Sequence, residues 1–296
     1  MREKIMDRLA EAVKEAVGIG CVVHFLKSEK NNGLIFQSVV IKEPGTNAAP
    51  LIYIDSIMER IEVREISLKD AAKEIASTYK NVKYSYNQKI HDVISNISRE
   101  YVLENVVYQL VNAEKNMRFL ADMPHKDFLD MVAVYRVVVD STESENVSFK
   151  VKKSLCDTLS ITEEELDAAA SQNTEKAGFC VKSIASIMTE ITGIPMPEEY
   201  DTDIPMFVIT NPKRFNGAAA MLYNSCFSDL AEKFGDDLYI LPSSIHEVLV
   251  IPAGNREPDD LRDMVCLINA SEVAGDEVLS NNVYRYSSKD RILSIV

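Results

Sequence analysis

Apolar and polar positions recur along this chain of 296 residues at two spacings, which distinguish predicted helices from predicted strands. Residues 1–17 carry apolar side chains at steps of four, which is typical of an amphipathic helix. Two apolar runs, 21–26 and 34–42, then flank Lys30-Asn31-Asn32-Gly33. Asn-Gly favours a hairpin turn because both residues tolerate positive φ angles. We therefore expect a helix followed by a β-hairpin.

A long predicted helix closes the N-terminal part of the chain. A third apolar run at 50–54 precedes a helix that starts after Ser67, whose hydroxyl suits an N-cap. Beyond it, from about residue 98, apolar residues recur at steps of three and four, namely Val102, Val106, Leu110, Ala113, Met117 and Leu120. This spacing predicts one long helix. We expect residues 1–122 to form an α+β subdomain that ends with it.

The remaining residues, 123–296, combine buried strands with helices. Residues 128–139 are apolar on both alternating faces apart from Asp130 and Arg136, which indicates a strand covered on both sides. Helix start and stop signals predict three later helices: one capped by Thr162 and Glu165, one over 217–234 ended by Gly235, and one opened by Pro258. The later predicted strands are a single strand at 206–210, a hairpin over 238–251, and strands at 283–286 and 292–296.

Strands that come in hairpins, with helices between the hairpins, favour one fold class. We expect an α+β fold with mostly antiparallel sheets rather than a doubly wound parallel sheet. The chain should contain two subdomains, 1–122 and 123–296.

The net charge of −14 limits the classes of partner. Residues 140–199 alone hold twelve acidic and five basic side chains. An acidic surface repels nucleic-acid phosphates and anionic membranes, so we expect neither as a partner, whereas it attracts a basic protein. The chain also lacks tryptophan, and its aromatic residues do not alternate with bases, which disfavours a stacking platform for single-stranded nucleic acid.

Cysteine usage and the apolar runs indicate the compartment. The chain has five cysteines, an odd number, and none of them shows Cys-x-x-Cys spacing. This usage indicates cysteines that act as small buried apolar residues in a reducing compartment, rather than disulfides or a zinc site. No run approaches the roughly 18 apolar residues that a membrane span needs, and no apolar signal core follows the charged N-terminus. We expect a cytoplasmic protein with no cofactor and no bound metal.

The densest group of catalytic-type side chains lies in a polar turn between two apolar segments, at Ser243, Ser244, His246 and Glu247. A serine nucleophile, a histidine base and a carboxylate are the parts of a hydrolase site. However, Ser-x-His within one turn is not the usual assembly, and no Gly-x-Ser-x-Gly elbow exposes a nucleophile. Because Pro-Ser-Ser is ordinary turn chemistry, we favour a structural or ligand-contact turn over nucleophilic catalysis.

A second group, His125, Asp127 and Asp130, stands at the entrance of the predicted strand. These residue types can bind a divalent metal. We favour a connection in which His125 satisfies backbone groups instead. A composite site of His125, Asp130 and His246 stays open, because the sequence does not show whether the two segments are neighbours.

A third group, Lys213 and Arg214, precedes the predicted helix start at Gly217. Two bases beside a helix N-terminus are a possible anion contact. Neither Gly-x-x-x-x-Gly-Lys nor Gly-x-Gly-x-x-Gly occurs, so nucleotide binding has no support from motifs.

Several segments together resemble a bacterial family of uncharacterised proteins, a domain-of-unknown-function family common in Firmicutes. The matching segments are Lys30-Asn31-Asn32-Gly33, Ile52-Tyr53-Ile54, residues 110–116, Pro124-His125 with Phe128-Leu129-Asp130, residues 169–174, Ile209-Thr210-Asn211 with Gly217-Ala218-Ala219, residues 241–247, and Leu279-Ser280 with Tyr284. The resemblance spans nearly the whole chain in order, and it implies no activity, cofactor or catalytic residue.

Two functional hypotheses follow. We favour a non-enzymatic interaction or regulatory protein with a protein partner, because catalytic-type groups are few and scattered. The alternative is an enzyme of unassigned class, hydrolytic or metal-dependent, with a site around Pro242–Glu247 and Pro124–Asp130.

Overall fold

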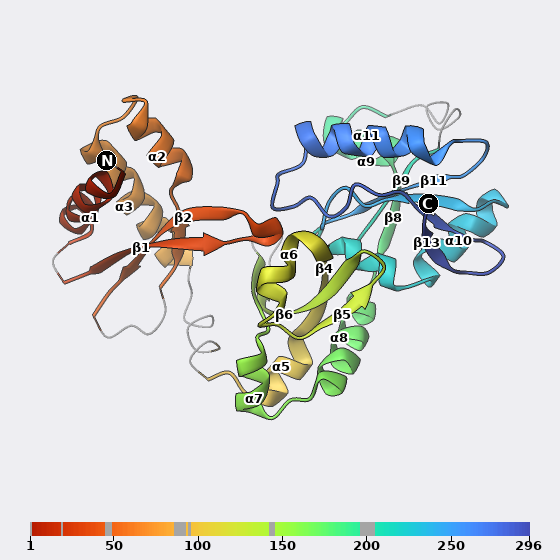
Figure 1. The fold of residues 1–296 in the computed structure, drawn as a ribbon, viewed down its shortest axis with the longest axis horizontal. Coiled ribbons are helices and arrows are strands. Elements are labelled where there is room, and N and C mark those ends of the chain that lie inside the picture. Colours follow the sequence, from red (N-terminus) through yellow and green to blue (C-terminus); the bar gives the residue numbers. More distant parts are fainter. Residues whose placement is uncertain are drawn as a thin grey trace. The chain divides into compact units, whose positions relative to one another are not determined.

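The computed structural model of the chain describes residues 2–18, 20–44, 49–85, 93, 96–141, 146–195 and 205–296. The chain divides into two compact units, Met1–Ile97 and Ser98–Val296. In the described part of the chain, every paired strand is antiparallel, and helices connect or cover the sheets (Figure 1). The predicted α+β class is therefore confirmed. None of the helices in these ranges is long and apolar enough to cross a membrane.

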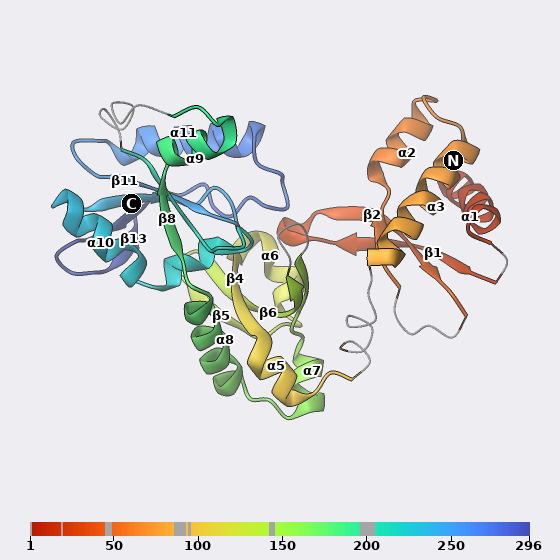
Figure 2. The same ribbon diagram turned by 180° about the vertical axis from the view of Figure 1, so that it is seen from behind.

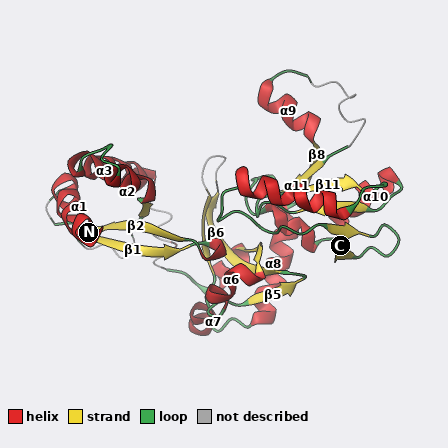
Figure 3. Cartoon of the chain, turned by 45° about the horizontal axis from the view of Figure 1, so that its top comes forward, coloured by secondary structure: helices red, strands yellow, loops and turns green. Residues whose placement is uncertain are grey.

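The first unit is a three-stranded sheet with helices on one face. Its strands run in the order β1 (Val22–Glu29), β2 (Ile35–Lys42) and β3 (Leu51–Tyr53), and its helices are α1 (Arg2–Val17), α2 (Asp55–Glu62) and α3 (Leu68–Ser85). Figure 3 shows the three helices together on one side of the β1–β2 hairpin. Leu9, Val39 and Ile75 are fully buried between helices and sheet. The predicted Asn-Gly turn is confirmed, with φ angles of 61° at Asn32 and 67° at Gly33.

The other face of this sheet is exposed and apolar. Val22, Leu26, Leu51 and Tyr53 keep between 39% and 48% of their surface accessible. The pairing register places them on one face, because Leu26 and Tyr53 both lie opposite Ser38. The Nζ atom of Lys30 lies 4.2 Å from the centre of the Tyr53 ring. We call these four apolar residues the open face of the first unit.

The second unit begins with a four-stranded sheet. Its strands are β4 (Val106–Asn112), β5 (His125–Phe128), β6 (Met131–Ser141) and β7 (Asn146–Lys150), and β6 pairs with all three others. Helices α5 (Arg99–Asn105) and α8 (Glu163–Ala177) lie side by side against it (Figure 2). Helix α6 (Ala113–Leu120) contributes to a small apolar cluster with Val111 and Val132, and α7 (Lys153–Leu159) follows β7.

A six-stranded sheet completes the second unit. Its order is β13 (Leu293–Ile295), β12 (Tyr284–Tyr286), β10 (Leu238–Leu241), β11 (Val248–Pro252), β9 (Phe207–Thr210) and β8 (Cys180–Ser183). Helices α10 (Ser225–Phe234) and α11 (Pro258–Ser271) lie on opposite faces of it (Figure 1). Val265 of α11 packs with Tyr239 and Ile251, whereas the ring of Phe227 on α10 contacts Tyr286. Helix α9 (Ile184–Thr192) follows β8.

The single long helix expected from about residue 98 to 120 is wrong. The segment forms α5, β4 and α6 in succession. A step of four residues also keeps side chains on one face of a strand, so Val102, Val106 and Leu110 fit both structures. Within β4, Leu110 and Val111 are both fully buried, which a strand between two layers explains and an amphipathic helix does not.

Two further differences follow from the observed elements. Residues 98–122 were expected to close the first subdomain, but they lie in the second compact unit because β4 pairs with β6. The helix expected over 217–234 is divided into a 3₁₀ helix, η3 (Gly217–Leu222), and α10. The capping box of Thr162 and Glu165, the C-terminal Gly235 and the Pro258 helix start are confirmed.

One carboxylate connects α8 to the four-stranded sheet. Asp167 accepts hydrogen bonds from the hydroxyls of Tyr108 and Tyr135 at 2.6 and 3.0 Å, and Lys126 Nζ lies at 3.1 Å. Burial opposes the charged form, but these hydrogen bonds outweigh it and lower the pKa of Asp167 below its ordinary 3.8. The charged carboxylate therefore stabilises the folded unit at neutral pH.

Asp167→Asn should lower the free energy of unfolding by about 1 kcal/mol at pH 7, because the ion pair with Lys126 is lost and the hydroxyl bonds weaken. Since the folded pKa lies below 3.8, the contribution is complete above that value and disappears as the pH falls through the folded pKa. Urea unfolding at pH 7 and below pH 4 measures both effects. The control is Asp157→Asn at an exposed position of α7, with an effect within about 0.5 kcal/mol. A D167N penalty that does not shrink in acid would contradict this account.

Candidate functional site

The predicted turn at residues 242–247 is held by local hydrogen bonds. Ser244 Oγ accepts a hydrogen bond from the backbone N–H of His246 at 3.0 Å. His246 Nδ1 accepts one from the backbone N–H of Asn216 at 3.1 Å. A neutral histidine whose Nδ1 accepts carries its proton on Nε2, which lies 3.4 Å from Glu277 Oε1. The His246 ring therefore positions backbone, and it has no free nitrogen lone pair with which to activate a serine.

The neighbouring Ser243 and Glu247 make different contacts. The Ser243 carbonyl accepts the N–H of Leu279 at 3.0 Å, which ties the turn to the segment before β12. Glu247 lines a surface cavity of about 580 Å³ together with Cys180 and Arg214. Ser244 and His246 thus make hydrogen bonds to backbone, Ser243 bonds through its carbonyl, and Glu247 lines a separate cavity.

The segment that the His246 ring holds is residues 211–216, which we call the β9–η3 loop. Asn211 organises it from within: its Oδ1 accepts the N–H groups of Lys213 and Phe215 at 3.0 and 3.2 Å, and its Nδ2 donates to the Phe215 carbonyl at 2.7 Å. Arg214 and Asn216 adopt left-handed φ angles of 51° and 58°. Such angles are strained for residues other than glycine and are maintained only by surrounding contacts.

Gly217 allows this loop to approach the turn. A Cβ atom at Gly217 would lie 2.2 Å from Thr210 Oγ1 and 2.5 Å from the His246 carbonyl oxygen. The Thr210 hydroxyl donates to that same carbonyl at 2.7 Å. The end of β9, the start of η3 and the His246 turn are therefore packed with no room for a side chain at this position.

Asp130 lies in a hydrogen-bonded cluster that does not include His246. Its Oδ2 accepts from Ser280 Oγ at 3.1 Å and from Asn282 Nδ2 at 2.9 Å, and its Oδ1 accepts from the Tyr284 hydroxyl. Burial, together with this hydrogen bond, raises the pKa of Tyr284. The carboxylate is saturated with donors and joins the β5–β6 turn to the segment that enters β12.

His125 also has a local partner. Its Nδ1 lies 2.9 Å from the Met123 carbonyl, so this nitrogen donates. In the described part of the chain, no three His, Cys, Asp or Glu side chains are grouped so that they could hold a metal ion. The composite site of His125, Asp130 and His246 is not assembled there.

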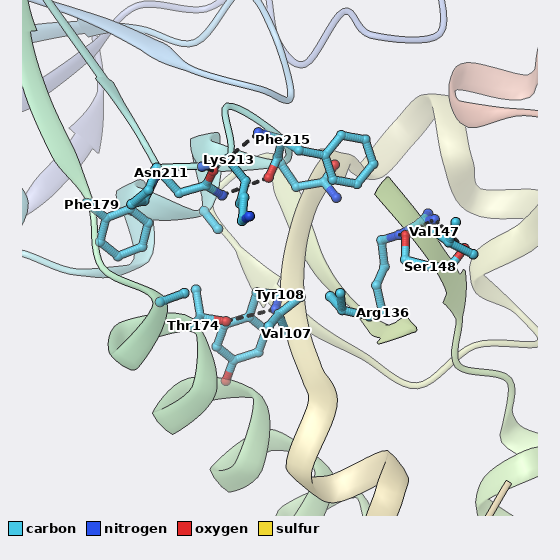
Figure 4. Close-up of a pocket in the computed structure, with 15 residues that line it drawn as sticks. Val107, Tyr108, Arg136, Val147, Ser148, Thr174, Phe179, Asn211, Lys213 and Phe215 are labelled. Atoms are coloured by element: carbon cyan, nitrogen blue, oxygen red, sulfur yellow. Dashed lines mark hydrogen bonds between the residues drawn. The ribbon is translucent and has the colours of Figure 1, made fainter. Parts of the chain in front are cut away.

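A cavity of about 310 Å³ lies where the β9–η3 loop meets the four-stranded sheet. Strands β4, β6 and β7, the end of α8 and the loop itself supply its walls. Figure 4 shows Arg136 and Ser148 at one end, Phe179 at the other, and Asn211 and Phe215 along one side. Most lining side chains are apolar, including Val107, Val138, Ala177 and Ala219.

Arg136 places a positive charge in this apolar surrounding. Its Nε and Nη2 donate to Ser148 Oγ at 3.1 and 2.8 Å, Nη2 also donates to the Ser148 carbonyl at 3.1 Å, and Nη1 donates to Gln109 Oε1 at 3.2 Å. All these acceptors are neutral. Burial lowers the pKa of Arg136 to about 10, so the guanidinium remains charged at neutral pH.

The charge of Arg136 has no local counter-ion among the described residues. No carboxylate of the described residues lies within ion-pair distance of Arg136, and the cavity lining contains Arg136 and Lys213 but no acid. A lining with two basic residues and no acidic one differs from the rest of this unit, because residues 98–296 contain 18 basic and 33 acidic side chains. The cavity is therefore a positively charged site within an acidic unit.

Asn216 adds an uncommitted polar group to the same wall. The residue is 5% exposed, its buried Oδ1 lacks a hydrogen-bond partner, and its side chain makes no hydrogen bond to a described residue. Unpaired buried amides are rare in folded proteins because they lose hydrogen bonds to water without compensation. An unpaired buried acceptor on the lining of a cavity is typical of a binding site.

The predicted anion contact at Lys213 and Arg214 is split by the structure. Lys213 lines the Arg136 cavity, whereas Arg214 pairs with Glu190 at 3.1 Å and lines the larger surface cavity. In the sequence, Arg136 was noted only as a charged residue that interrupts an apolar strand. That position could have indicated a site residue, because a charged side chain in a strand covered on both faces must be buried.

Gly217→Ala should destabilise the second unit by about 2–3 kcal/mol, because the added methyl group overlaps Thr210 and His246. The matched control is Gly193→Ala, where φ is 68° and a Cβ meets nothing within 4 Å. That change costs only left-handed strain, about 1 kcal/mol. Thermal unfolding compares the two variants, and a G217A penalty no larger than that of G193A would refute the close packing.

Comparison with known proteins supplies the family but no activity. A model of a family of unknown function, DUF5688, matches residues 2–288. None of the curated proteins gives a match, and neither does any solved structure. Because the family model covers nearly the whole chain, the resemblance seen in its sequence is confirmed, and this protein belongs to the DUF5688 family of unknown function.

Proposed function

We propose that this protein is a non-enzymatic regulatory protein that binds a small anion in the Arg136 cavity. The observation that carries the proposal is a partly buried guanidinium with only neutral acceptors at a cavity whose lining includes no acid. An anion would supply the missing counter-charge where the low dielectric makes such a pair strong.

The cost of burying Arg136 supports this reading. Taking an ion out of water costs several kcal/mol unless it is paired and hydrogen-bonded. An apolar residue of similar size at this position of β6 would avoid that cost. A charge retained next to an empty volume of about 310 Å³ is therefore explained better by ligand recognition than by stability.

The contacts of the catalytic-type residues support a non-enzymatic role. His246 Nδ1 is occupied by the Asn216 N–H, Ser244 Oγ by the His246 N–H, and Asp130 by three donors. Each of these groups stabilises a junction between segments. None of the described hydrogen bonds joins a serine hydroxyl to a histidine ring, the nucleophile–base pair of a hydrolase with a Ser–His site.

Arg136→Gln should abolish the stabilisation of this protein by anions. We expect at least one of sulfate, phosphate, citrate and benzoate to raise the unfolding temperature of the wild-type chain. A ligand at 100 times its Kd contributes about 2.7 kcal/mol. Differential scanning fluorimetry at constant ionic strength measures the rise. The control Arg118→Gln, on α6 outside the cavity lining, should respond like wild type. If no anion stabilises the wild type, or if R136Q responds equally, the proposal fails.

Binding of a protein partner is a second candidate, favoured by the open face of the first unit. Contiguous exposed apolar surface commonly marks an interaction site. Lys30 lies over Tyr53, Lys42 pairs with Val22, and the register places no acidic residue on this face of the three strands. Although the net charge of the chain favours a basic partner, the chemistry of this face fits an acidic protein surface with an apolar centre.

Leu26→Asp should remove this binding, because it places an acid in the centre of the open face. The control is Ile292→Asp, which changes another exposed apolar residue in the second unit. Affinity capture from the host, followed by reconstitution with the purified partner, compares the chains. An acidic protein that binds wild type and I292D but not L26D, and that dissociates in high salt, supports the candidate. Equal capture by all three chains, or capture by none, contradicts it.

A further inference from the structure

The Arg136 cavity has a charged end and an apolar end. Figure 4 shows Arg136 beside Ser148 at one end and Phe179, next to Thr174, at the other. The Phe179 ring is held against the Tyr223 ring, with centroids 5.4 Å apart. A ligand that fills such a volume must combine a polar head with an apolar body.

The donors at the charged end specify the head group. A guanidinium has five N–H donors, and the bonds to Ser148 and Gln109 use four at most. One N–H of Arg136 is therefore left for a ligand, whereas the unpaired Oδ1 of Asn216 on the cavity lining is an acceptor. A carboxylate oxygen accepts a charged guanidinium N–H in a short, strong hydrogen bond.

The charge of the cavity selects between a monoanion and a dianion. Arg136 is the partly buried cation of the lining, whereas Lys213 is exposed. A phosphate or sulfate dianion would keep about one uncompensated charge in an apolar cavity, which is strongly unfavourable. A monocarboxylate matches the single charge of this guanidinium.

We infer that the cavity binds an organic monocarboxylate whose head contacts Arg136 and whose apolar body lies against Val107, Val138 and Phe179. This inference rests on the proposed anion-binding function and names its ligand class. A guanidinium whose protein partners are all neutral favours a charged head group over a neutral one, because only the charged group supplies a counter-ion. Neutral analogues of the same shape should therefore bind poorly.

The test uses the full chain and defined probes. Isothermal titration calorimetry compares octanoate and phenylacetate with their neutral amides and with inorganic phosphate. We expect the acids to bind at least ten times more tightly than their amides, and phosphate not to bind. The isosteric change Asn216→Asp should reduce the affinity for the acids at least tenfold, because it adds a negative charge to the cavity lining. Asparagine and aspartate both tolerate the φ of 58° at this position.

Phe179→Ala provides a second, independent variant. It enlarges the apolar end without touching the head-group donors, so the preferred acid should become longer by two to four carbons relative to wild type. Affinity is measured for a series from hexanoate to dodecanoate. An unchanged length preference in the folded variant would contradict the placement of the apolar body.

The outcomes separate this inference from the proposed function. If phosphate or sulfate binds through Arg136 and the acids do not, the protein binds anions but the ligand class is overturned. If amides and acids bind equally, and R136Q binds them equally too, both the ligand class and the anion-binding function are overturned. If none of these probes binds, the inferred ligand class is refuted.

Discussion

The close contact between Gly217 and the His246 carbonyl is the constraint on which the candidate site depends. It brings three distant segments together: the end of β9, the start of η3 and the turn between β10 and β11. The His246 ring then holds the Asn216 backbone, and Asn211 closes the β9–η3 loop on itself. The wall of the cavity that carries Asn216 is thereby fixed before any ligand arrives, which reduces the entropy lost on binding.

The segments that carry the family resemblance meet in space. Thr210 bonds to the His246 carbonyl, Asn112 donates to the Leu279 carbonyl at 3.2 Å, and Asp130 binds Ser280 and Tyr284. Each contact joins residues far apart in the chain. Buried polar groups of this kind are satisfied only in one arrangement, so they select a unique packing of the two sheets of the second unit. These residues therefore have a structural explanation that is independent of catalysis.

Local signals in the sequence were sufficient for much of the fold. The Asn32-Gly33 turn and the Thr162–Glu165 box depend on a few neighbouring residues, and both form as expected. The β4 strand was missed because its apolar spacing also fits a helix. The adjacent buried pair of Leu110 and Val111 was the more informative signal, since residues one apart face opposite sides only in a strand.

The candidate site was less accessible to prediction. For the 242–247 turn the sequence favoured a structural or ligand-contact role, and the bond of Ser244 to the His246 N–H is local chemistry of that kind, whereas the bond of the His246 ring to Asn216 joins distant residues. The Arg136 cavity depends on contacts between β6, β7, α8 and the β9–η3 loop, which periodicity does not encode. Lys213 was proposed as an anion contact because two adjacent bases stand out in the chain, whereas the lone charge of Arg136 within an apolar strand was a signal that was not used.

The outer edge of β4 has one more consequence. Thr174 Oγ1 accepts the Tyr108 N–H at 2.9 Å, and Asn173 Nδ2 donates to the Val106 carbonyl at 2.9 Å, so side chains of α8 occupy groups that another strand would otherwise pair with. A bare edge is a template for aggregation, and this helix blocks it. Thr174 also lines the cavity. Any motion that lifts the C-terminal turn of α8 would therefore widen the cavity and expose unpaired backbone groups of this edge at the same time.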